Sequence, residues 1–259
     1  MFDIINHKLF KMKKILLGII IIGGLNFSYA QPSEGQIVML HFFKVDKEKM
    51  ANYEAAMKEY GQKRAQSWID NGCQYYWELR RVKPSSTSFS RDFNYIALDI
   101  LPSGKKTRGD CGDFNSGLSD GMEKIMMEIT GDKDRVYYTR LSYVDGFSMN
   151  KPIVNAYWQF FRVFQMDKFN NRLKEDVLPL YSKYSNRAYM HGFQREPIPG
   201  GDGVNEWNYL VSFGIDSDKK NQLTPKMWNS TLKKWGNGAE IREMRYTLET
   251  QLVTNASSK

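Results

Sequence analysis

The sequence lacks most of the features that assign a function directly. It has two cysteines in 259 residues, and they do not form the CxxC spacing of a zinc or redox motif. Its 37 lysines and arginines are interspersed with 29 acidic residues, so no basic block marks a nucleic-acid-binding surface. The longest apolar run, residues 15–25, is shorter than the about 20 residues that a membrane span needs. These absences disfavour zinc modules, nucleic-acid-binding proteins and transmembrane proteins.

The N-terminus has the three-part pattern of a secretory signal peptide. Two lysines precede the apolar run, and Ser28 and Ala30 supply the small residues expected before a cleavage site. We expect residues 1–30 to be removed and the mature chain to be exported, to the periplasm or the cell exterior, without a stable membrane anchor. An uncleaved anchor is the alternative. The sequence leaves open whether translation starts at Met1 or Met12.

The charge of the expected mature chain is only mildly positive. Without residues 1–30 it carries 33 basic and 28 acidic residues, a net charge of +5 rather than +8. An exported protein also rarely meets nucleic acid. The composition therefore predicts a mildly basic surface and no nucleic-acid partner.

A short echo indicates a duplicated unit. The stretch HFFKV at residues 41–45 returns as QFFRV at residues 159–163. A second echo, FNYI at residues 93–96, returns as WNYL at residues 207–210, in the same order along the chain. Two echoes in one order are harder to attribute to chance than one.

The segments around the echoes also follow one order in both halves. Helical spacing of apolar residues and alternating or aromatic runs predict strand, helix, strand, strand, helix and strand. The expected elements are residues 41–45, 50–71, 74–82, 93–101, 120–129 and 135–144, then 159–163, 166–191, 193–198, 207–215, 224–235 and 241–253. We therefore expect two βαββαβ repeats, at residues 36–147 and 153–253.

A βαββαβ unit is the ferredoxin-like motif, an antiparallel four-stranded sheet with two helices on one face. Two such units in tandem, each opening with an aromatic strand, resemble the dimeric α+β barrel superfamily. The resemblance implies an α+β fold in which two sheets pack face to face around a central cavity, here within one chain. It implies no single activity, because this fold hosts many functions.

The opening strand of each repeat offers a candidate site residue. Alternation places His41 on the same face as Phe43, and Gln159 on the same face as Tyr157. If that face lines the cavity, one polar group from each half meets an aromatic lining, which is typical of a small-molecule pocket. His41 is then a catalytic candidate, and Gln159 and Tyr157 are expected to bind ligand. A hydrogen-bonded core or rim histidine is the alternative.

Charged residues on other strands are further candidates. Glu78 and Arg80 lie opposite the more apolar face of their strand, which predicts that they point into the cavity. Arg140 and Arg245 occupy matching places in the two closing strands and are expected to add cationic groups there. Such groups bind a carboxylate or phenolate well. They could equally pair with one another and hold the barrel shut.

The superfamily that the chain resembles includes cofactor-independent monooxygenases, haem-degrading enzymes and chlorite dismutase, which binds haem through a histidine of its second half. The only histidine in the second half here is His191, expected at the C-terminus of a helix, where the helix dipole accounts for it. Arg195, four residues on, is a poor match for the distal arginine of that enzyme. We therefore expect no cofactor, with haem as an alternative.

The two cysteines fall at one edge of the expected sheet. Cys73 precedes the second strand and Cys111 follows the third, which is its antiparallel neighbour. In an exported protein this placement predicts a disulfide, which would close a loop of about 38 residues and contribute roughly 3–4 kcal/mol to stability. Two free thiols are the alternative.

The sequence leaves three functions open. The first is binding of a small aromatic or anionic molecule in the cavity between the sheets. The second is a cofactor-independent monooxygenase or isomerase with His41 as general base. The third is a structural duplicate whose cavity is filled by side chains. The oligomeric state is also open.

Overall fold

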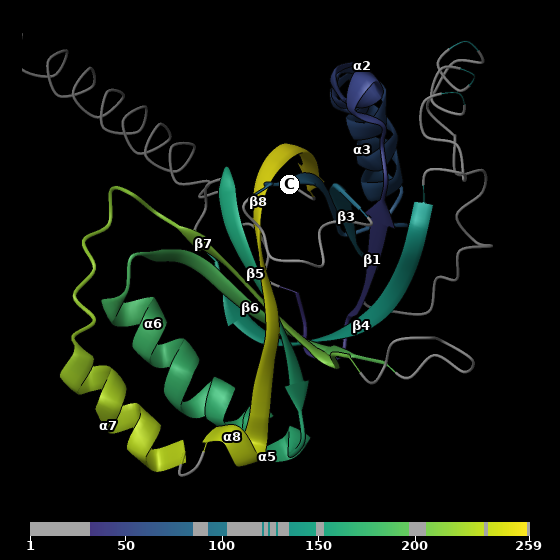
Figure 1. The fold of residues 1–259 in the computed structure, drawn as a ribbon. Helices are drawn as coiled ribbons and strands as arrows, with labels where there is room; N and C mark the ends of the chain where they lie inside the picture. Colours follow the sequence, from purple (N-terminus) through teal and green to yellow (C-terminus); the bar gives the residue numbers. More distant parts are fainter. Residues whose placement is uncertain are drawn as a thin grey trace, which may run out of the picture.

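Eight antiparallel strands close into a barrel in the computed structural model, which describes residues 32–84, 93–102, 135–148, 153–196, 206–235 and 238–257 and the single residues 121, 124 and 128. Around the barrel the strand order is β1-β3-β2-β8-β5-β7-β6-β4, and β4 pairs back with β1 (Figure 1). The strands are β1 Ile37–Phe43, β2 Tyr76–Val82, β3 Tyr95–Ile100, β4 Arg135–Phe147, β5 Asn155–Val163, β6 Arg187–Arg195, β7 Tyr209–Ile215 and β8 Arg242–Ser257. The expected α+β class is confirmed.

Helices cover the outside of the barrel in two groups, which lie far apart in Figure 1. The helices are α2 Met50–Ala56, α3 Gln62–Asp70, α5 Met166–Arg172, α6 Leu178–Tyr184, α7 Pro225–Trp235 and α8 Gly238–Ile241. A π-helical turn joins α2 to α3 at Met57–Gly61, and another joins α5 to α6 at Leu173–Val177. Within the described part of the chain, no helix has the length and apolarity needed to cross a membrane.

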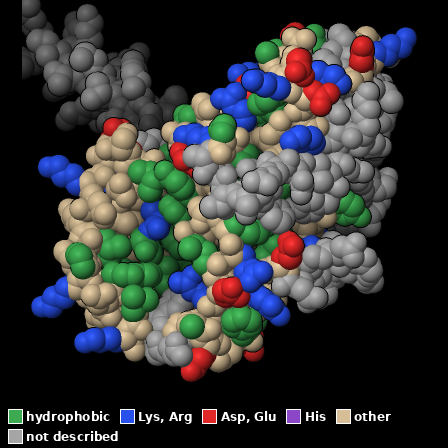
Figure 2. Space-filling model, viewed as in Figure 1, with side chains coloured by type: hydrophobic (Ala, Val, Ile, Leu, Met, Phe, Trp, Pro, Cys, Tyr) green, Lys and Arg blue, Asp and Glu red, His purple; other side chains and the backbone are tan. Residues whose placement is uncertain are grey.

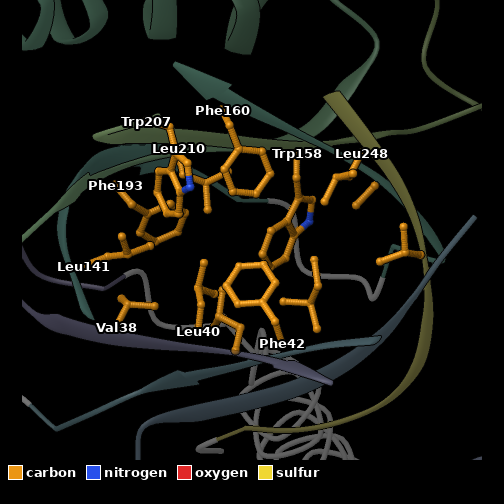
Figure 3. Close-up of a cluster of buried hydrophobic side chains, with 14 of the residues drawn as sticks. Val38, Leu40, Phe42, Leu141, Trp158, Phe160, Phe193, Trp207, Leu210 and Leu248 are labelled. Carbon is orange, nitrogen blue, oxygen red and sulfur yellow. The ribbon is translucent and has the colours of Figure 1, made fainter. Parts of the chain in front are cut away.

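The apolar side chains form one core inside the barrel and two outside it. The inner core brings Val38, Leu40 and Phe42 of β1 against Trp158 and Phe160 of β5, as Figure 3 shows. One outer core lies beneath α2 and α3, and the other lies beneath α5 and α6. Both faces of the strands are therefore largely buried, which explains why their sequences are so aromatic.

The second echo corresponds to one hydrogen-bonding arrangement that occurs in both halves. The Asn94 side chain accepts from the backbone N–H of Val45 at 2.9 Å and donates to the backbone carbonyl of the same residue at 2.7 Å. Asn208 does the same with Val163, at 2.7 and 2.9 Å. Each asparagine thus fixes the chain just where the first strand of its half ends.

Aromatic contacts near these asparagines also match between the halves. Phe42 meets Phe93 edge to face at 4.8 Å, and Phe160 meets Trp207 in the same way at 4.9 Å. Such pairs favour edge-to-face packing because the ring edge is positive and the face negative. The echoed aromatic residues therefore have equivalent places in the inner core.

One expected element boundary is wrong. We expected a helix to reach His191, but α6 ends at Tyr184 and β6, which begins at Arg187, contains His191. The pair His191 and Gly192 resembled a helix terminus, yet His191 continues an alternation with Tyr189 and Phe193 on one strand face. Tertiary pairing with β4 and β7 decided the outcome.

The expected end of the first helix is confirmed. Gly72 has φ +71°, the left-handed conformation typical of the residue after a helix, and Cys73 N donates to Trp68 O at 2.9 Å. Cys73 is buried and disulfide-bonded. The only other cysteine of the chain, Cys111, lies outside the described residues, as do the expected signal peptide and most of the helix at residues 120–129.

We expect Asn94→Ala and Asn208→Ala each to lower the free energy of unfolding by about 1–3 kcal/mol, because each leaves a backbone N–H and carbonyl without their partner. Urea unfolding followed by tryptophan fluorescence measures this. Asn221→Ala is the matched control, since Asn221 is exposed and makes one local hydrogen bond to Leu223 N. A control loss as large as the other two would contradict the assigned role.

Candidate functional site

The inner face of β1 carries Val38, Leu40 and Phe42, so alternation turns His41 to the outside. The expectation that His41 and Gln159 line the cavity is therefore wrong. Tyr157, on the same face as Gln159, also lies outside and stacks on Phe213 at 5.3 Å. The alternation along each strand is as predicted, but β1 and β5 are aromatic on both faces, and no local pattern indicates which face points inward.

Glu78 and Arg80 do point into the barrel, as expected from the sequence. Arg80 Nη2 lies 2.9 Å from Glu78 Oε2, and both side chains are almost fully buried. The hydroxyl of Tyr76 donates to the same Glu78 oxygen at 2.9 Å. Arg80 also donates to the backbone carbonyls of Ile153 and Val154, at 3.3 and 3.4 Å. These contacts form a buried polar cluster on the inner face of β2.

The surroundings of Arg80 raise its pKa. Burial acts to lower the pKa of the guanidinium, but Glu78, Tyr189 and Tyr76 together outweigh burial. Burial, followed by the negative charge of Glu78, raises the pKa of the Tyr76 hydroxyl well above its usual value. Arg80 is thus a permanent cation and Tyr76 a neutral donor.

Across the barrel, β6 presents Tyr189, His191 and Phe193 to the inside. In the closed strand order β2 and β6 are separated by three strands on either side, so these rings face the β2 cluster. The Tyr189 ring stacks on His191 at 5.4 Å, and its hydroxyl pKa responds to the charges of Arg80 and Glu78 as well as to burial. The two strands therefore contribute to one polar region.

His191 is a partly buried, neutral imidazole. Its Nδ1 lies 3.3 Å from the Tyr143 hydroxyl and its Nε2 lies 2.8 Å from Ser148 Oγ. Burial lowers the pKa of His191 to about 4, from an ordinary value of 6.5. Gly146 of β4 makes room for the ring, because a Cβ there would stand 2.3 Å from His191 Nδ1. The sequence signal for this site was the alternation on β6, which we read as a helix end.

Arg140 and Arg245 do not reach the interior, so the expectation that they add cationic groups to the cavity is wrong. Both are exposed, and they pair with Glu196 and Glu243 on the outer surface. Besides Arg80, Arg195 of β6 also lies inside the barrel. Its Nε donates to Thr139 Oγ1 at 3.0 Å, and its guanidinium lies 4.7 Å from the Trp207 ring centroid.

Two buried donors inside the barrel lack an acceptor among the described residues. They are Nε1 of Trp158, on β5, and Nε of Arg80, on β2. β5 and β2 lie on either side of β8, so both donors belong to the same part of the barrel wall. Leaving a buried N–H group without an acceptor costs about 1–3 kcal/mol, so each calls for water or a ligand.

A second arrangement with chemical capacity lies outside the barrel at His41. His41 Nε2 is 3.2 Å from Asp99 Oδ2, and the two side chains are 23% and 18% exposed. Gln74 Nε2 donates to the other oxygen of Asp99. The His41 ring also stacks near Phe43 and Tyr138, each at 6.2 Å. A carboxylate held in this way fixes the orientation of the imidazole.

The surroundings of His191 do not fit a haem. A haem iron would need one imidazole nitrogen and an open space beside it. Both nitrogens already face hydroxyl groups, and the rings of Tyr143, Tyr189 and Phe193 lie within 5.4 to 6.2 Å of the imidazole. We therefore derive no step through haem. No cluster of three His, Cys, Asp or Glu side chains able to hold a metal occurs in the described ranges.

The fold matches solved structures at low sequence identity. A proposed monooxygenase from Fusobacterium nucleatum superposes with a TM-score of 0.53 and 11% identity, covering 88% of this chain and 96% of its own. A proposed monooxygenase from Lactobacillus acidophilus superposes with a TM-score of 0.52 and 9% identity, covering 86% of this chain and 97% of its own. An anthrone oxidase-like protein superposes with a TM-score of 0.50 and 10% identity, covering 86% of this chain and 93% of its own.

These likenesses show that the fold of this chain is shared with those structures. Only about a tenth of the aligned residues are identical, so the likenesses establish the fold and no activity, because one fold serves many activities. No family model matches the sequence. No curated protein matches it either.

The buried state of His191 predicts a loss of stability in mild acid. Because the folded pKa of about 4 lies below 6.5, the unfolded chain binds more protons between these values, and stability falls as pH decreases through this window. The loss is at most about 3 kcal/mol. His191→Gln should flatten this part of the profile in urea unfolding from pH 7 to pH 4, whereas Asn221→Ala, a change at an exposed residue that does not titrate, should not. An unchanged profile in His191→Gln would contradict the assignment.

Proposed function

We propose that this protein binds a small molecule with an aromatic body and oxygen acceptors inside the barrel. The observation that carries the proposal is the pair of buried N–H donors, Trp158 Nε1 and Arg80 Nε, that have no acceptor among the described residues. A carboxylate, phenolate or carbonyl oxygen would accept from them.

The surrounding residues support this ligand class. Arg80 is a cation paired with Glu78, and burial keeps the pKa of the Tyr189 hydroxyl above its usual value, so Arg80 and Tyr189 offer donors to a ligand. Tyr76, Tyr189 and His191 keep some accessible surface although they belong to the barrel interior. Aromatic side chains fill much of the rest of the interior, which suits a flat aromatic body.

The proposed setting of this site is a duplicated unit in an exported protein. Residues 36–147 and 153–253 would be tandem ferredoxin-like units, supported by the strand orders β4-β1-β3-β2 and β8-β5-β7-β6 within the closed barrel. The matched asparagine contacts and π-helical turns of the two halves support the same proposal. The N-terminal sequence supports export to the periplasm or beyond, and the partner would be a small molecule rather than nucleic acid.

We expect a native mass spectrum of the purified protein to show an extra mass of a small molecule that disappears on denaturation. Trp158→Phe keeps an aromatic side chain but removes the N–H together with the five-membered ring, so it should lower ligand occupancy about tenfold, the loss of a hydrogen bond to a charged acceptor. Trp68→Phe, on α3 outside the barrel, is the control and should leave occupancy unchanged. The expected extra mass would also reveal a haem group directly.

Two observations together would contradict the binding proposal. If the native protein carries no extra mass and Trp158→Phe raises the melting temperature, the N–H group is simply unsatisfied. The barrel would then be a structural core, and the binding proposal would be wrong.

A second candidate function is a cofactor-independent monooxygenase or isomerase with His41 as the catalytic base. The observation that favours it is the ion pair of His41 with Asp99, which is partly exposed and held from behind by Gln74. In this function His41 takes a proton from a substrate carbon or oxygen, and Asp99 stabilises the imidazolium that forms. Two structures of similar fold are described as proposed monooxygenases and a third as anthrone oxidase-like, which makes oxygen consumption the assay of choice.

We expect oxygen uptake with anthrone as probe to exceed the uncatalysed rate, and His41→Ala to reduce kcat by about a hundredfold, as expected for loss of a general base. Asp99→Asn should lower kcat less, because His41 remains in place and only its carboxylate partner is lost. Lys44→Ala, an exposed neighbour, is the control. Equal uptake by wild type and His41→Ala would exclude this role for His41.

A further inference from the structure

Arg187 lies outside the barrel and belongs to neither of the sites described above. Arg187 is the first residue of β6, and the pairing of β6 with β7 shifts register between Arg187 and Tyr189. A bulge of this kind turns a side chain to the other face of the sheet. Tyr189 points inward, so the bulge turns Arg187 outward, toward α6.

Two aromatic rings enclose the Arg187 guanidinium. It lies 3.6 Å from the Tyr181 ring centroid, on α6, and 4.2 Å from the Phe213 ring centroid, on β7. Stacking of this kind occupies the faces of the planar group and leaves its N–H edges for hydrogen bonding. Its Nε is buried and has no acceptor among the described residues.

The positive charge of Arg187 is not balanced by a neighbouring carboxylate. Among the residues that the structure describes, no Asp or Glu lies within ion-pair distance of it. Burial lowers the pKa of Arg187, and Tyr181 opposes this effect. A second guanidinium, that of Arg242, lies 4.6 Å from the Phe161 ring centroid and experiences the same two influences. Tyr181 thus has two partly desolvated cations near it, an arrangement that favours an anion.

Aromatic side chains surround these cations. Tyr157 stacks on Phe213 at 5.3 Å, and Trp228 of α7 lies against Tyr181 at 5.5 Å. On the face shown in Figure 2, hydrophobic side chains gather where Figure 1 places α6 and α7, and Lys and Arg side chains project around them. The region combines aromatic surface with positive charge.

We propose that Arg187 is the recognition residue of a second ligand site, between β6 and α6 outside the barrel, which binds a small aromatic carboxylate. The carboxylate oxygens accept from the terminal N–H groups of Arg187, a residue that is partly exposed, and the aromatic body packs on neighbouring rings. This site lies on the opposite side of the sheet from the donors of Trp158 and Arg80. It does not depend on the function proposed for the interior.

The test is a titration of the purified, ¹⁵N-labelled protein with benzoate, observed through the Nε–H resonance of Arg187. We expect this resonance to shift saturably, and we expect acetate and inorganic phosphate to bind more weakly because they have no ring. Arg187→Lys keeps the charge but loses the planar fork, and should reduce benzoate affinity about tenfold or more. Arg162→Gln is the matched control, since Arg162 is an exposed arginine 5.6 Å from the Phe164 ring on the same sheet.

Three results would overturn the proposal. One is an Arg187 Nε–H resonance that does not move with benzoate. Another is benzoate binding of equal strength in Arg187→Lys and wild type, which would place benzoate elsewhere, including the barrel interior. The third is acetate or phosphate binding as tightly as benzoate, which would remove the aromatic requirement. The wild-type titration gives a result even if Arg187→Lys fails to fold.

Discussion

Closure of the barrel is the constraint on which the rest of the structure depends. β2 pairs with β8 and β4 pairs with β6, so the two four-stranded halves leave no free sheet edge. The helices then cover the outside of each half. Because the strands are buried on both faces, polar side chains on them have lost water and need another partner. The chemical character of each of these polar side chains therefore depends on the hydrogen-bond or charge partner that replaces water.

The same residue type therefore behaves differently on the two faces of the barrel wall. His191, inside, is surrounded by aromatic rings, and burial holds its pKa at about 4. His41, outside, lies against the Asp99 carboxylate and remains partly exposed. The first is a neutral group packed among rings inside the barrel, and the second has the carboxylate partner that a proton-transfer residue uses.

Arginine shows the same dependence on environment. Arg80 is balanced by Glu78 within the barrel, whereas Arg187 is enclosed by two rings without a carboxylate partner among the described residues. Exposed Arg140 and Arg245 pair with glutamates, where solvent and salt weaken the attraction. All four residues are cations, so it is burial that distinguishes the candidates for ligand recognition, Arg80 and Arg187, from the arginines in surface ion pairs.

Much of the fold could be predicted from the sequence because local patterns carried it. Apolar periodicity located α2 and α3, glycine after Asn71 marked the helix end, and the two echoes identified equivalent strands. The inward direction of Glu78 and Arg80 was also predictable, since the other face of β2 was clearly more apolar. For β1 and β5 both faces were aromatic, and the pattern could not say which one pointed inward.

The sequence by itself determined the α+β class, the order of most elements and which residues share a strand face, because these depend on neighbours along the chain. Only the tertiary structure decided which face became the interior, since that depends on pairing between strands far apart in sequence. It also placed His191 in a strand, paired His41 with Asp99 and turned Arg187 outward through a bulge. Those contacts join residues whose proximity no local pattern records.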